Sequence, residues 1–194
     1  MPEIIRTLIY DVFMNGPSES PANASPGTGV AVIIIDSTAN TLNIVSDTFS
    51  GLLGTTTASH IHCCTALPDA GTAGVATQTP SFTGFPLGVT SGSYSMGFDM
   101  TQASTWNPAF IAAEGGTPAG AEAALVAGAA AGEAYLNIHS TVVPGGEIRG
   151  FLVPVSVPEP GTLSLAFAGL ASMFLASKGR KGVSRPPASP DAAG

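Results

Sequence analysis

All three histidines of the chain lie in two short segments whose residue types suit metal binding. His60 and His62 are separated by one isoleucine, and His139 comes much later in the segment NIHS. On a strand, residues two apart point to the same face, so His60 and His62 would present two imidazoles side by side. Imidazole is a ligand for both zinc and copper, and His139 would complete a three-nitrogen site if its strand is adjacent.

A structural interpretation of the same residues is also open. In that interpretation the histidines bond to one another, to Glu147 or to backbone carbonyls, and they pin a hairpin to the rest of the fold. Glu147 and Arg149 are two residues apart, so on a strand they would share a face and form a structural ion pair. No cofactor is required by this interpretation, and the metal content of the protein would distinguish the two.

Cys63 and Cys64 follow His62 directly and are the only cysteines of the chain. In an oxidising compartment they can pair with each other or between molecules. As thiolates they would be soft ligands for copper(I), and as buried free thiols they would only fill space. No Gly-x-Ser-x-Gly motif, phosphate-binding loop or useful pair of carboxylates is present, so we expect no enzymatic activity.

The elements that must position these residues are strands. Apolar residues alternate or run continuously between turn formers in segments 7–14, 29–35, 41–49, 93–100, 134–139 and 147–153. Between residues 104 and 131 the spacing becomes helical and alanine-rich, which favours one or two short helices. The pattern predicts an all-β fold, an antiparallel sandwich or barrel of seven or eight strands with a short helical insertion.

The C-terminal part has the order of a membrane-sorting signal. The residues Val157, Pro158, Glu159 and Pro160 precede an uncharged run, 161–177, and then the basic residues Lys178, Arg180 and Lys181. Seventeen residues make roughly 25 Å of helix, at the short end of what crosses a bilayer. Basic residues stay on the cytoplasmic side, so we expect a transmembrane helix with the acidic body outside and a disordered tail over 183–194.

This arrangement over residues 156–182 resembles the PEP-CTERM sorting signal of bacteria that secrete exopolysaccharide. The resemblance implies an exosortase as processing partner, contact with the membrane, and a place in the cell envelope or outside the cell. The N-terminal segment shows no leader peptide of the required length, and we expect the true leader to lie upstream of the assigned start.

The body, residues 7–155, resembles the CHRD family on the segments ASHIHCC, GFPLGVTSGSY, AYLNIHS and PGGEIRGFL, in that order. Membership implies a Greek-key β-barrel of the immunoglobulin-like or superoxide-dismutase-like kind in an exported protein, and it implies no general enzymatic activity. The His-x-His pair is also similar to copper ligands of Cu/Zn superoxide dismutase. That enzyme needs more histidines than the three present here, so dismutase chemistry is not expected.

Charge excludes one class of partner. The net charge is −7, and only Arg6 and Arg149 precede the basic C-terminal cluster, so nucleic-acid binding is not expected. The leading hypothesis is a non-enzymatic surface or extracellular-matrix protein, with exopolysaccharide as a candidate partner. The alternative is a periplasmic or surface protein that binds copper or zinc through His60, His62 and His139.

Overall fold

The computed structural model describes residues 7–155, which form one compact unit. Within these residues no helix is long and apolar enough to span a bilayer. The expected sorting segment 156–182, its apolar helix 161–177 and the tail 183–194 lie outside the described residues, so the membrane helix and the disordered tail stay predictions.

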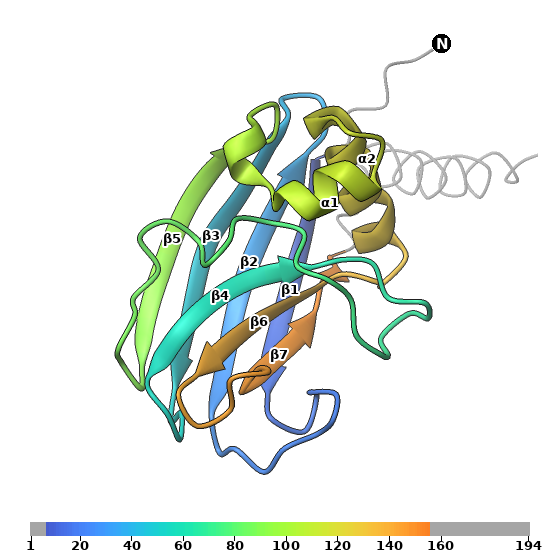
Figure 1. Cartoon of the computed structure of the whole chain (residues 1–194). Coiled ribbons are helices and arrows are strands. Elements are labelled where there is room, and N and C mark those ends of the chain that lie inside the picture. Colours follow the sequence, from blue (N-terminus) through green and yellow to red (C-terminus); the bar gives the residue numbers. More distant parts are fainter. Residues whose placement is uncertain (1–6, 156–194) are drawn as a thin grey trace, which may run out of the picture. The chain divides into compact units, whose positions relative to one another are not determined.

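The described unit is a curled antiparallel sheet (Figure 1). Its strands are β1 (Thr7–Asn15), β2 (Thr28–Asp36), β3 (Thr41–Ser50), β4 (Thr56–His62), β5 (Gly92–Asp99), β6 (Tyr135–Ser140), β7 (Ile148–Phe151) and β8 (Val153–Pro154). They are ordered β4-β6-β7-β1-β2-β3-β5, and β8 pairs with β1. In Figure 1 the β4-β6-β7 part crosses in front of the β1-β2-β3-β5 part.

The core fills the space between these two parts of the sheet. Strands β1 and β2 alternate buried and exposed side chains, because successive residues of a strand point to opposite faces. The inward residues are large and apolar, and the fully buried ones include Tyr10, Ile33, Leu42, Ile61 and Ile138. The period-two apolar pattern therefore decides which face of each strand turns inward.

The helical insertion lies between β5 and β6, at one end of the sheet (Figure 1). It consists of the 3₁₀ turn η1 (Ala103–Thr105) and the helices α1 (Pro108–Ala113) and α2 (Pro118–Ala130). Both helices start with proline at the first turn, after a residue, Asn107 or Thr117, whose side chain accepts a backbone N–H. These are favoured N-terminal residues because they satisfy N–H groups that have no partner inside the helix.

Strand β3 departs from simple alternation at a bulge. Its register with β5 shifts between Ile44 and Asp47, and the two intervening side chains, Val45 and Ser46, are both exposed. The extra residue turns Asp47 inward, where its side chain is fully buried. A charged residue type therefore occupies a core position that the alternation alone would assign to Ser46.

The expected all-β antiparallel class with a short helical insertion is confirmed. Every named strand pair is antiparallel, and both helices fall within the predicted interval 104–131. The segment 147–153 differs from the single strand that was predicted. It contains β7, which pairs with β6, and the first residue of β8, which pairs with β1, and the backbone of Leu152 between them donates to Ala134.

Candidate metal centre

The three histidines lie on adjacent strands. Strands β4 and β6 pair antiparallel, with Ala58 opposite His139, His60 opposite Asn137 and His62 opposite Tyr135. Ile61, between the two β4 histidines, points into the core, so the histidines occupy the opposite face of this part of the sheet. The expectation that β4 carries His60 and His62 on one face, with His139 on a neighbouring strand, therefore agrees with the structure.

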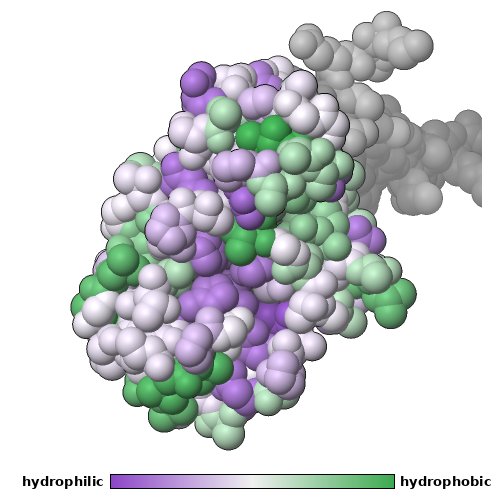
Figure 2. Space-filling model, in the orientation of Figure 1, coloured by the Kyte–Doolittle hydropathy of each residue, from purple (hydrophilic) through white to green (hydrophobic). Residues whose placement is uncertain are grey.

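A loop segment covers the outer edge of β4. The backbone N–H of Cys63 donates to Gly74, that of Ala76 to Ile61, and that of Phe82 to Ser59. Segment 73–82 thereby runs along the strand and brings its carbonyls over the imidazoles. Polar residues gather in the middle of this face of the domain (Figure 2).

Each histidine uses one ring nitrogen to hydrogen-bond a backbone carbonyl. His60 Nε2 lies 2.6 Å from the oxygen of Pro80, His62 Nδ1 lies 2.9 Å from that of Ala73, and His139 Nδ1 lies 2.9 Å from that of Pro144. A carbonyl only accepts, so the bonded nitrogen carries the proton. In a neutral imidazole the other nitrogen then has a free lone pair.

The second nitrogens have no hydrogen-bond partner. His60 Nδ1, His62 Nε2 and His139 Nε2 are all buried, and no described residue bonds to them. Burial lowers the pKa of His60 and of His139, and it lowers the pKa of His62 to about 4. The three rings are therefore neutral at physiological pH, with lone pairs available for coordination.

The three side chains are close enough to share one ion. One ring nitrogen from each lies within 4.8 Å of the others, and the ring centroids are 5.1 to 5.8 Å apart. Zn–N bonds of about 2.0–2.1 Å place two nitrogens at most about 4.2 Å apart, so the most widely spaced nitrogens would approach by at least about 0.6 Å on binding. A carbonyl behind each ligating ring is the usual outer contact of a metal-binding histidine.

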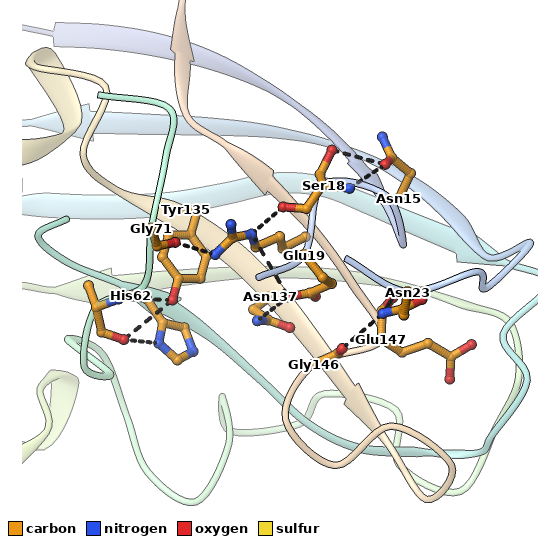
Figure 3. Close-up of polar contacts among 12 residues, drawn as sticks. Asn15, Ser18, Glu19, Asn23, His62, Gly71, Tyr135, Asn137, Gly146 and Glu147 are labelled. Atoms are coloured by element: carbon orange, nitrogen blue, oxygen red, sulfur yellow. Dashed lines mark hydrogen bonds and ion pairs between the residues drawn. The ribbon is translucent and has the colours of Figure 1, made fainter. Parts of the chain in front are cut away.

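Residues that the sequence did not single out support His62. The ring of Tyr135 stacks on it with centroids 4.8 Å apart and planes 7° apart, and the Tyr135 hydroxyl donates to the same Ala73 carbonyl as His62 (Figure 3). The Arg149 guanidinium lies over the Tyr135 ring, 4.6 Å from its centroid. Tyr135 is the first residue of β6, a strand of mostly buried residues, and nothing in the neighbouring sequence marks it as a partner of His62.

The two cysteines do not join the centre. Cys63 and Cys64 are bonded to each other as a disulfide, and both sulfurs face Ala124 and Gly128 of α2. A disulfide sulfur is not a thiolate, so the expectation of thiolate ligands for copper(I) does not hold in this state. Their pairing with each other was one of the two alternatives for an oxidising compartment.

Glu147 and Arg149 have structural contacts, but not with each other as predicted. Glu147 accepts hydrogen bonds from Ser25 and from the backbone N–H groups of Leu53 and Gly54. Burial raises its pKa, but these bonds and one from Ser140 outweigh burial and hold the pKa below its usual value.

Arg149 pairs instead with Glu19, at 3.8 Å, and donates to the carbonyls of Ser18 and Gly71. Glu147 precedes β7, so the expected i, i+2 placement on one strand face does not form. Glu147 instead bonds the region around residues 52–54, while Arg149 bonds the turn that follows β1.

Comparison with known families gives the domain its identity. The family profile of the CHRD domain matches residues 10–152, most of the described unit and well over half of the chain. The chain belongs to the CHRD domain family. No curated protein and no solved structure matches it.

The segment after the CHRD domain matches a second profile. Residues 156–181 carry a PEP-CTERM protein-sorting motif, as expected from Val157, Pro158, Glu159, Pro160 and the basic cluster. The two matches together mark an exported protein of the cell envelope or extracellular space that is sorted by an exosortase.

Proposed function

We propose that the CHRD domain of this exported protein binds one transition-metal ion through His60, His62 and His139. The observation that carries the proposal is the convergence of the three histidines: one ring nitrogen of each lies within 4.8 Å of the others, and each ring has a buried nitrogen without a hydrogen-bond partner. Burying a polar atom without a hydrogen bond costs about 1–3 kcal/mol, and three such atoms are a costly arrangement for a purely structural cluster. A bound cation would use all three lone pairs at once.

The same contacts give a preformed site rather than a flexible one. His60 and His62 are more than nine-tenths buried, on a strand whose edge is covered, and each ring is oriented by a carbonyl. Ligands held in place by their outer contacts lose little conformational freedom on binding. Nothing in the set resembles a nucleophile or a general acid, so the proposed role is metal binding or storage without enzymatic turnover.

The sorting motif supports a role in the envelope. We propose that the apolar segment 161–177 anchors the precursor in the membrane until an exosortase removes it, which leaves the CHRD domain at or outside the surface. Contact with exopolysaccharide stays a prediction, because no residue in the described range argues for a carbohydrate.

Elemental analysis of the full-length protein tests the metal proposal. Protein purified without chelators and without nickel resin should carry close to one equivalent of copper or zinc. His60→Ala and His139→Ala should each abolish the metal, because two imidazoles alone hold it weakly. Ile61→Val is the matched control: it perturbs the same strand on its core face and should retain the metal. A metal content near zero in the wild type, or one unchanged by His60→Ala, would refute the proposal.

A further inference from the structure

The ligands at this site are uncharged. Among residues 7–155, the histidines form the one cluster of three or more metal-ligating side chains, and no carboxylate belongs to it. The two buried glutamates of the neighbouring loops are engaged elsewhere, Glu147 with backbone N–H groups near residue 53 and Glu19 with Arg149. The cysteines are bonded to each other. The charge of a bound ion would therefore not be neutralised by the protein.

Arg149 places a cation next to the surroundings of the site, where burial lowers the pKa of His62 and the charge of Arg149 lowers it further. The Arg149 guanidinium lies over the ring of Tyr135, and the same ring stacks on the imidazole of His62. The Tyr135 ring therefore connects the cation to a proposed metal ligand. The carboxylate that accompanies it, Glu19, contacts Arg149 rather than the histidines, and Figure 3 shows it well apart from His62. The polar contacts of Arg149 with Ser18 and Gly71 hold the guanidinium in this position.

Because the ligands are uncharged and the neighbouring Arg149 is a cation, the affinity of the site should depend strongly on the charge of the bound ion. The cost of moving an ion out of water grows with the square of its charge, so a dication is penalised about four times as much as a monocation. Imidazole itself suits both zinc and copper, so ligand type does not choose between them.

We infer that the three-histidine centre selects monovalent copper over zinc and over divalent copper, an inference that rests on the proposed metal-binding function. The selecting features are the uncharged ligand set, the burial of the three nitrogens and the Arg149 cation behind Tyr135. The chemical class of the ligand is thus a soft monocation, handed over by a copper(I) donor without reduction of the Cys63–Cys64 disulfide.

Competition titrations of metal-free, full-length protein test this selectivity. Copper(I) should be bound at least 100-fold more tightly than zinc when each is titrated against a colorimetric chelator, copper(I) without oxygen. The reduction potential of the bound copper should lie above that of copper ions in water, because the site favours the reduced ion. Zinc binding as tight as copper(I) binding, or a lowered potential, would overturn the selectivity while leaving the metal centre itself intact. Failure to bind either metal would refute both.

A pair of variants separates the charge of Arg149 from its shape. Arg149→Gln removes the cation and should reduce the preference for copper(I) over zinc several-fold, because the guanidinium repels a dication about twice as strongly as a monocation. Arg149→Lys keeps the charge and should keep the preference. Thermal unfolding checks that both variants fold, and if the glutamine variant does not, the wild-type titration and potential still decide. An equal preference in both folded variants would rule out the role of the cation.

Discussion

Replacing Asp47 by asparagine should stabilise the CHRD domain, and increasingly so as the pH rises. The bulge in β3 buries the Asp47 carboxyl completely, and neither of its oxygens has a hydrogen-bond partner among the described residues. Burial raises the pKa of Asp47 from 3.8 to about 7. The folded state therefore holds this proton more tightly than the unfolded state does, and stability falls as the pH rises from about 4 to about 7.

The magnitude follows from the two pKa values. With 3.8 for the unfolded chain and about 7 for the folded protein, the destabilisation by Asp47 is about 1.7 kcal/mol at pH 5 and about 4 kcal/mol at pH 8. Asparagine has nearly the same shape and no charge to lose. The stability gained by Asp47→Asn should therefore be about 2.5 kcal/mol larger at pH 8 than at pH 5.

Urea unfolding of the wild type and the variant at both pH values measures this difference. Comparing the two proteins at each pH cancels the contributions of other groups that titrate in this range. One such group is Glu19, because burial raises its pKa to about 7 although the charge of Arg149 acts to lower it. Asp11→Asn, on the outer face of β1, is the matched control and should change stability by less than about 0.5 kcal/mol at either pH. An effect of Asp47→Asn that is the same at pH 5 and pH 8 would refute the argument.

Three further outcomes are expected. Gly128→Ala, inside α2, should destabilise by about 1–3 kcal/mol in thermal unfolding, because its Cβ would collide with both disulfide sulfurs, although glycine to alanine normally stabilises a helix interior. Gly145→Ala, with open space around its Cβ, is the control, and a stabilised Gly128 variant would contradict the packing. Alanine at residues 158–160 should leave the precursor uncleaved in a host with an exosortase, and an intact mass showing normal removal of the tail would count against the motif. A reporter fused after Arg185 should be cytoplasmic, and a secreted reporter would exclude the anchor.

The strand pattern was predictable wherever burial alternates regularly. Strands β1 and β2 show period two because one face of each is in the core, and their predicted limits differ from the observed ones by at most one residue at either end. Asp47 could not be placed by the same reasoning, because a bulge reverses the faces and leaves no signature in a single sequence.

The candidate site was predictable in its ligands and not in its surroundings. The His-x-His spacing places two imidazoles on one face whatever the rest of the fold does, and β6 is indeed adjacent. The partner of Arg149 could not be found this way, since Glu19 lies in a turn-rich segment 130 residues earlier. Contacts between such distant segments depend on the tertiary arrangement, and spacing along the chain does not encode it.

The outer contacts of the three histidines are main-chain carbonyls, those of Ala73, Pro80 and Pro144. Any amino acid supplies a backbone carbonyl. If the path of the loop is kept, the residues at these positions can therefore be substituted without changing the orientation of the imidazoles. Relatives that share this centre should therefore retain the histidines within loops of very different composition. Insertions and deletions in segment 73–82, which displace the carbonyls, should be far less tolerated than exchanges of residue type.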